Sequence, residues 1–241
     1  DHSAYDSYAV LVEADGERVF YSGDFRMHGR KQSVMARLIH DRPPGIDLLL
    51  LEGTTVGRIE KTQPLMEDEL VCRFVDGIQK TEGLVLVWAS GQNLDRLVTL
   101  WKACRIARRQ LIVDMYTASI LHASGNRRIP QSNWKDFRVF LPAGQRFRII
   151  QSGRFDVSAV HRSGRIYPQQ IRLAADRTVM LFRPSMIRDL ESISELPIGR
   201  LICSVWRGYM DDASSEPMRS WLEKREIPLD FIHTSGHASK D

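Results

Sequence analysis

The pattern of apolar and polar positions predicts a chain in which short strands alternate with helices. Strands are expected where β-branched and aromatic residues cluster, at residues 8–13, 18–22, 48–51, 84–88, 111–115, 179–182, 201–205 and 229–233. Helices are expected where apolar residues recur at helical spacing, at residues 65–78, 93–109, 169–175, 185–192 and 214–225. This alternation is typical of an α/β fold, with a mostly parallel sheet flanked by helices.

Two local signals of β structure stand near the start of the chain. Asp15 and Gly16 lie between two β-prone runs and predict a tight hairpin turn. The unbroken leucine run at residues 48–51 predicts a strand that is buried on both faces. The sequence changes from a β-rich to an α/β pattern near residue 60, and Pro228 precedes the last predicted strand, so we expect boundaries at both places.

The composition is that of a globular protein, with 43% hydrophobic and 27% charged residues. No apolar run approaches the roughly 20 residues of a membrane-spanning helix, so no membrane partner is expected. The three cysteines stand far apart and include no CxxC pair, which argues against a zinc ribbon or a disulfide framework. We therefore expect a cytoplasmic protein, or a nuclear one if the source is eukaryotic.

Charge is distributed unevenly, although the net charge is only +4. Residues 1–70 contain thirteen acidic and eight basic side chains, whereas residues 137–175 contain seven arginines and one acid. Such a basic segment can attract a polyanion through phosphate contacts and release of counterions. A solvated basic face of a globular domain has the same composition, so charge alone leaves both interpretations open.

Polar clusters that could carry chemistry follow or border the apolar strands, where a rigid sheet holds loop side chains in place. The first cluster combines His2 with Asp24, because an imidazole and a carboxylate can share a divalent metal ion. A carboxylate such as Asp24 can also bridge two ions. The second is Glu52, which could orient a ligating imidazole or take part in proton transfer. Each residue, taken alone, is equally compatible with an ordinary loop.

The third cluster is the segment HTSGHAS, in which His233, Ser235 and His237 surround a glycine. Glycine permits a sharp turn that can aim imidazoles and backbone N–H groups at one point, which suits a phosphate or a metal-bound leaving group. Arg127 and Arg128, together with the basic segment, could form a track for phosphates. The other histidines have no partners in sequence and are interpreted as ordinary surface or core residues.

In their order along the chain, these motifs resemble the metallo-β-lactamase fold nucleases of the β-CASP family. That family includes ribonuclease J, the cleavage and polyadenylation endonuclease and the DNA cross-link repair nucleases. DHSAYDS with His2 resembles the third metal motif of the family, YSGDFR with Asp24 the fourth, and LLLLEGTT with Glu52 the acidic motif that opens the β-CASP part. SGQNLDR and VDMYTA resemble the β-CASP core of the family, and SVWRGYM and HTSGHAS resemble its exit. His237 in HTSGHAS would be the residue of the family's second β-CASP motif.

The resemblance implies a β-CASP domain at residues 61–228. Residues 1–60 would be a partial, β-rich portion of a metallo-β-lactamase αββα domain, and residues 229–241 would be a return strand and loop into that domain. Two family motifs are absent from the chain, an upstream HxHxDH and a C-terminal HGE-like motif. We therefore expect the chain by itself to bind zinc weakly or not at all and to cleave little, because dinuclear zinc needs more ligands than His2 and Asp24.

In the intact protein, the resemblance implies two zinc ions that activate water for attack on a phosphodiester bond. His2 would bind one ion and Asp24 would bridge both, while Glu52 and His237 would orient ligands and assist proton transfer. The substrate phosphates would be held by His233, Ser235, Arg127 and Arg128. The expected substrate is single-stranded nucleic acid, with RNA favoured over DNA, and the expected process is RNA processing or decay, with DNA repair as the activity of some relatives. The oligomeric state is left open, a homo-oligomer included.

Two other classes of function remain open from the sequence. One is a metallo-hydrolase of a small ester or thioester on the same fold. The other is a non-catalytic module that binds nucleic acid or a protein partner. A nucleotide-binding enzyme of the Rossmann type is disfavoured, because no GxGxxG or Walker loop follows any predicted strand.

Overall fold

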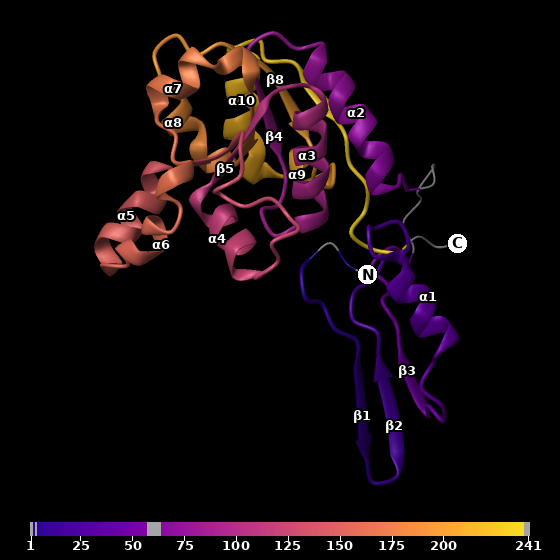
Figure 1. The fold of residues 1–241 in the computed structure, drawn as a ribbon. Coiled ribbons are helices and arrows are strands. Elements are labelled where there is room, and N and C mark those ends of the chain that lie inside the picture. Colours follow the sequence, from indigo (N-terminus) through magenta and orange to yellow (C-terminus); the bar gives the residue numbers. More distant parts are fainter. Residues whose placement is uncertain (1, 3, 57–63, 239–241) are drawn as a thin grey trace.

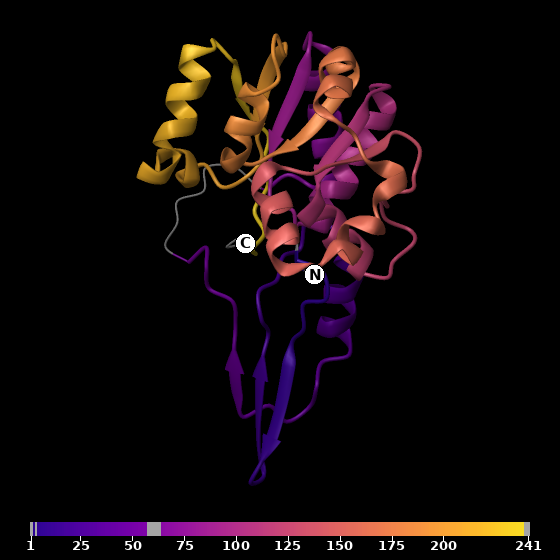
Figure 2. The same ribbon diagram turned by 90° about the vertical axis from the view of Figure 1, so that its left-hand side faces the viewer.

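The computed structural model describes residues 2, 4–56 and 64–238, and these form a larger α/β unit from which a three-stranded arm extends (Figures 1 and 2). The larger unit contains a six-stranded sheet in which every pairing is parallel. Its strands, in the spatial order β6-β5-β7-β4-β8-β9, are Phe137–Phe140 (β6), Gln110–Asp114 (β5), Thr178–Phe182 (β7), Leu84–Trp88 (β4), Ile198–Cys203 (β8) and Leu229–Phe231 (β9). The predicted α/β class is therefore confirmed.

Helices cover both faces of this sheet and create two hydrophobic cores. Successive side chains of a strand point to opposite faces, so Val85 and Val87 enter one core while Leu84 and Leu86 enter the other. The helices on the first face include Glu67–Gln79 (α2), Leu94–Ile106 (α3) and Met115–Ala123 (α4); those on the second include Pro168–Leu173 (α7), Ile187–Glu191 (α8) and Glu216–Lys224 (α10). The remaining helices of this unit are Ala143–Ser152 (α5), Phe155–Ala159 (α6) and Gly208–Asp211 (α9).

Side-chain caps begin two of the helices at the carboxyl ends of strands. The Asn93 side chain accepts a hydrogen bond from the Arg96 N–H at 2.9 Å and starts α3. Asp114 ends β5, and its carboxylate accepts from the Thr117 N–H at 2.9 Å to start α4. Each cap satisfies one of the N–H groups that a helix leaves unpaired in its first turn. Among the described residues, no helix has the length and apolar character needed to cross a membrane.

The arm is a small sheet of order β1-β2-β3, formed by Val10–Ala14 (β1), Glu17–Tyr21 (β2) and Leu48–Leu50 (β3), with the helix Gln32–His40 (α1) between the last two strands. The predicted hairpin is present, since β1 and β2 pair antiparallel around Asp15 and Gly16. Both turn residues have positive φ, 53° and 85°, as a two-residue hairpin turn requires.

The prediction that residues 48–51 form a strand buried on both faces is wrong. All four leucine side chains are between 46% and 60% exposed. The reason is that β3 is an edge strand, paired to β2 alone, and the described residues cover neither face of the arm at this point. Val10 and Val12 on β1 are exposed in the same way, at 46% and 51%.

The last strand connects the larger unit to the arm. β9 pairs with β8 in the six-stranded sheet, so the boundary expected at residue 228 falls before the final strand of the larger unit. Residues 232–238 then leave the sheet as an extended segment that returns to the base of the arm (Figure 1). The junction of the two units is therefore built from segments far apart in the sequence.

Candidate functional site

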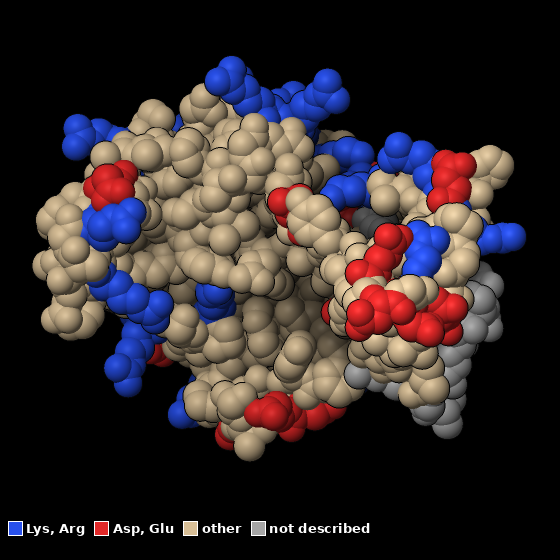
Figure 3. All heavy atoms as spheres, turned by 90° about the horizontal axis from the view of Figure 1, so that it is seen from below, with Lys and Arg blue, Asp and Glu red and all other residues tan. Residues whose placement is uncertain are grey.

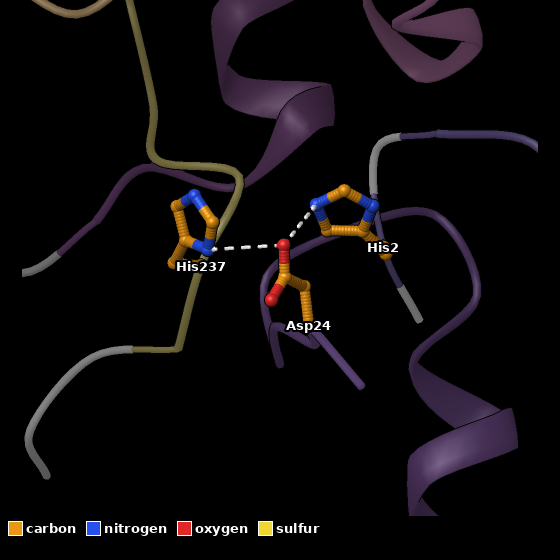
Figure 4. Close-up of side chains that lie close together, drawn as sticks. All are labelled: His2, Asp24 and His237. Carbon is orange, nitrogen blue, oxygen red and sulfur yellow. Dashed lines mark ion pairs between the residues drawn. The ribbon is translucent and has the colours of Figure 1, made fainter. Parts of the chain in front are cut away.

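Three loops bring His2, Asp24 and His237 side by side at the junction (Figure 4). His2 precedes β1, Asp24 follows β2 and His237 follows β9. One potential ligand atom from each residue lies within 4.8 Å of the other two. The structure thus places both residues expected to bind metal in one cluster, and it adds His237 to them as a third potential ligand.

The two imidazoles face the same carboxylate oxygen. Oδ2 of Asp24 lies 3.9 Å from Nε2 of His2 and 4.0 Å from Nδ1 of His237, and the two ring centroids are 5.9 Å apart. These separations are too long for hydrogen bonds. Two atoms that bind one tetrahedral zinc ion at about 2.0–2.2 Å stand roughly 3.4 Å apart, so shifts of about half an ångström would let each nitrogen share an ion with Asp24.

Nδ1 of His237 has the environment of a metal ligand. This nitrogen is buried and makes no hydrogen bond with any described residue, although Oε1 of Glu52 lies only 3.4 Å away. Buried polar atoms in proteins are nearly always satisfied, so an unpartnered one needs an explanation. Two imidazoles and a carboxylate are donors that zinc accepts, and the described residues therefore fit one zinc ion with three protein ligands.

His2 is held in the neutral form that binds metals. Burial lowers the pKa of His2, and His237 lowers it further, against the opposing effect of Asp24. Its Nδ1 accepts a hydrogen bond from the Ala4 N–H at 3.2 Å, which places the ring proton on Nε2. Nε2 is the atom that faces Asp24, so binding of a metal ion there would displace this proton.

The Glu52 carboxylate accepts hydrogen bonds from three loops of the site. Its side chain is 2% exposed. Oε1 accepts from the Thr54 N–H at 3.0 Å, and Oε2 accepts from the N–H groups of Ala238 at 3.0 Å and Phe25 at 3.4 Å. Burial raises the pKa of Glu52, but these hydrogen bonds and the nearby His237 outweigh it and leave the pKa lowered. An ionised carboxylate with these hydrogen bonds fixes the backbone next to His237, through the Ala238 N–H, and is not suited to delivering a proton.

The loop that carries His237 is fixed through Ser235. The Ser235 hydroxyl accepts a hydrogen bond from the His237 N–H at 3.0 Å. The Ser235 carbonyl oxygen accepts from Nη1 of Arg26 at 3.1 Å and lies 2.7 Å from Nε2 of His28. His28, which the sequence suggested was an ordinary residue, is buried and supports this loop. Ser235 therefore lies in the site, and because its hydroxyl only accepts in these contacts, its O–H could still donate to a phosphate.

His233 lies at the root of the same loop, turned toward the sheet. Its Nδ1 is 3.2 Å from the Ser204 carbonyl oxygen, to which it donates. Burial lowers the pKa of His233 to about 4, and the charge of Arg96 acts in the same direction. His233 is therefore neutral near pH 7 and could offer a phosphate only a neutral hydrogen bond.

Arg127 and Arg128 are not part of the cluster. Both are exposed in the loop that follows α4. Within the described ranges, no ion pair or hydrogen bond connects either guanidinium to His2, Asp24 or His237. A role in binding phosphates would place them along a longer substrate and outside the candidate metal centre.

Sequence reasoning missed a buried ionic network behind the site. Arg26, Glu67 and Arg96 are all buried, and both arginines approach Oε1 of Glu67 at 3.2 Å. Arg26 also donates to Oδ2 of Asp95 at 2.6 Å, and Arg96 donates to the Ser204 carbonyl at 3.0 Å. Arg26 and Arg96 belong to the motifs YSGDFR and SGQNLDR, and membership of these motifs was the only sign in the sequence that they could matter. Because arginine side chains are usually exposed, the sequence did not predict that these two are buried.

Comparisons with known proteins bear on the fold alone. No family model matches the chain, and no curated protein matches it either. A solved structure described as a protein of unknown function from Enterococcus faecalis V583 is similar, with a TM-score of 0.71 at 18% sequence identity. The match covers 99% of this chain and 51% of that one, so the chain spans about half the length of the solved structure.

Proposed function

We propose that the chain is part of a zinc-dependent nuclease that hydrolyses phosphodiester bonds in single-stranded nucleic acid, RNA rather than DNA, in RNA processing or decay. The observation that carries this proposal is the meeting of His2, Asp24, Glu52 and His237 at one point. These residues come from motifs that stand in the order of the β-CASP family. In this proposal residues 61–228 are the β-CASP domain, and the segments on either side belong to a metallo-β-lactamase domain.

Each residue of the site would have a distinct role in this proposed reaction. Zinc, when bound, would supply a Lewis acid that activates water and stabilises negative charge on the phosphate. His2, Asp24 and His237 would hold it, since they form the cluster of donors among the described residues. Glu52 would hold the backbone of Ala238, the residue after His237, against the site. The described donors would hold one zinc ion, whereas the proposed mechanism uses two, so the chain by itself is expected to cleave slowly.

The charges on the surface around the junction support a nucleic-acid substrate. Viewed from below, acidic side chains gather on the end of the arm, most of the charged side chains around the larger unit are Lys and Arg with a few acidic groups among them, and the surface between the two is recessed (Figure 3). A phosphate backbone would be repelled by the arm and attracted to the larger unit, so a strand would pass along the larger unit next to the candidate metal centre. Contacts of this kind position a backbone without reading its sequence.

The direct test is cleavage of labelled single-stranded RNA and DNA by the whole native protein. Asp24→Asn and His237→Ala should each lower the rate by about 100-fold or more, because each removes a metal ligand. His40→Ala is the matched control, since His40 is exposed at the end of α1 and is not one of the clustered residues, and its rate should stay unchanged. Full cleavage by Asp24→Asn would remove this residue from the mechanism. Binding of RNA with no cleavage by any form would instead support a non-catalytic module.

A further inference from the structure

A pocket lies at the opposite end of the six-stranded sheet from the candidate metal centre. It has a volume of about 450 Å³ and is lined by the end of α3 and by the segments that lead into β5, β6 and β7. The metal centre lies beyond the carboxyl end of β9, whereas this pocket lies at the amino ends of strands that run parallel to it (Figure 1). Its size falls within the roughly 300–1,000 Å³ that small-molecule sites occupy.

The lining of this pocket is strongly basic. Its cationic side chains are Arg105, Arg108, Arg109, Lys135 and Arg177, against a single acid, Asp136. Asp176 lies 3.8 Å from Arg177 and also acts on Arg109, and Arg105 lies over the Trp101 ring at 5.9 Å, whereas Arg108 and Lys135 form no ion pair with any described residue. Cations gathered in a concave site without partners repel one another unless an anion joins them.

The end of α3 explains only part of this charge. A helix carboxyl end favours cations, which accounts for Arg105, Arg108 and Arg109. It does not account for Lys135, which precedes β6, or for Arg177, which precedes β7. Three separate segments therefore deliver cations to one pocket.

Two of the arginines are held in place by the backbone. Arg109 donates through Nη1 to the Gly83 carbonyl at 2.7 Å and through Nη2 to the Thr81 carbonyl, which anchors its guanidinium. Arg108 occupies the position after the helix cap with φ of 55°, where its N–H bonds the Arg105 carbonyl and the Arg109 N–H bonds the Cys104 carbonyl. Glycine is the usual residue in this motif, so an arginine there retains a charged side chain at some conformational cost.

We propose that this pocket binds a small ligand carrying two or more phosphate groups, such as a nucleoside diphosphate. Arginine matches phosphate oxygens with paired N–H donors, and five cations around one cavity call for more negative charge than a single phosphate carries. The pocket is a half-open hollow of limited volume, which suits a small phosphorylated molecule. The proposal does not depend on the nuclease function, because none of the lining residues belongs to the candidate metal centre.

The test is calorimetric titration of the 241-residue chain with ADP and with AMP at physiological salt. ADP should bind, and AMP should bind about tenfold more weakly or less. Arg105→Glu with Arg108→Glu should reduce ADP affinity about tenfold or more, whereas Arg146→Glu with Arg148→Glu on α5 should leave it unchanged. The second pair makes the same change in net charge on an exposed surface outside the pocket. Absence of ADP binding, or equal loss in both pairs, would overturn the proposal.

Arg108→Gly gives an independent check that does not risk unfolding. Glycine adopts positive φ without strain, so this variant should melt at a higher temperature than the original chain. It should nevertheless bind ADP more weakly, because it removes one of the cations that line the pocket. A variant that is more stable and binds ADP with unchanged affinity would exclude Arg108 from the site and contradict the proposal.

Discussion

Nη1 of Arg26 lies 3.2 Å from Oε1 of Glu67, and both side chains are almost completely shielded from solvent, at 0% and 1% exposed. Arg26 belongs to the loop that follows β2 in the arm, whereas Glu67 begins α2 in the larger unit. The same arginine nitrogen also donates to the carbonyl of Ser235, in the loop of His237. This pair therefore connects the segment of Asp24 to the segment of His237 and sets their relative position.

Replacement of Glu67 by glutamine should destabilise the fold strongly. The change preserves the shape of the side chain but leaves Arg26 and Arg96 buried without their shared counter-charge. Loss of one partner from a buried ion pair costs about 3–5 kcal/mol. Urea denaturation at pH 7 measures the loss, and Asp68→Asn is the neighbouring control, since the Asp68 side chain is 75% exposed. A loss below about 1 kcal/mol, as for an exposed pair, would show that the network does not join the units.

The free energy of unfolding should decrease as the pH falls from about 6.5 toward 4, because His233 takes up a proton in the unfolded chain over this range. Its pKa is lowered from 6.5 to about 4 in the folded chain by burial, with a contribution from Arg96. Between these values the unfolded chain binds a proton that the folded chain does not, so stability is complete above about pH 6.5 and declines as pH falls toward 4. The shift corresponds to at most about 3 kcal/mol, since one pKa unit is worth about 1.4 kcal/mol.

His233→Asn isolates this contribution, because asparagine can still donate to the Ser204 carbonyl but does not titrate. Denaturation measured between pH 7 and pH 4 should show a smaller decline for the variant than for the original chain. His40→Asn, at an exposed position, should follow the original curve. Parallel curves for all three proteins would mean that His233 is not held neutral by the fold.

Zinc affinity should depend on all three clustered side chains. The 241-residue chain is expected to bind zinc with low affinity, and His2→Ala, Asp24→Asn and His237→Ala should each weaken it about tenfold or more. Competition with a chromogenic zinc chelator measures these constants. His40→Ala again provides the control, with unchanged affinity expected. If His237→Ala binds zinc as well as the original chain, then its unpartnered Nδ1 has another cause.

Gly23→Ala should disturb the site from the backbone. Gly23 has φ of 59°, and an added Cβ would lie 2.8 Å from the Tyr8 carbonyl oxygen, closer than a methyl group can approach. The loop must shift, so stability should fall by about 1–3 kcal/mol and zinc binding should weaken with it, because Asp24 is the next residue. Gly144→Ala on α5 has open space and should be neutral or stabilising by up to about 1 kcal/mol. Equal effects of the two changes, measured by denaturation, would contradict this account.

Local patterns in the sequence determined much of the secondary structure. The turn at Asp15 and Gly16 follows from two residues that tolerate positive φ, and α3 begins at Asn93 because its side chain caps the first turn. The apolar runs indicated five of the six strands of the large sheet, since burial on both faces leaves continuous apolar segments, but they did not indicate β6 at Phe137–Phe140, where Arg138 interrupts the run. The order of polar motifs along the chain also predicted that His2 and Asp24 would belong together.

Only the tertiary structure decided which side chains are buried and what they touch. The leucines at residues 48–51 are as apolar as a core strand, yet they are exposed because no described segment packs over them. Arg26 and Arg96 are charged, yet both are buried because Glu67 arrives from a distant helix to neutralise them. Whether a side chain is buried, and which side chain it contacts, depends on segments that meet only in the folded chain. A local sequence pattern carries no information about such distant segments.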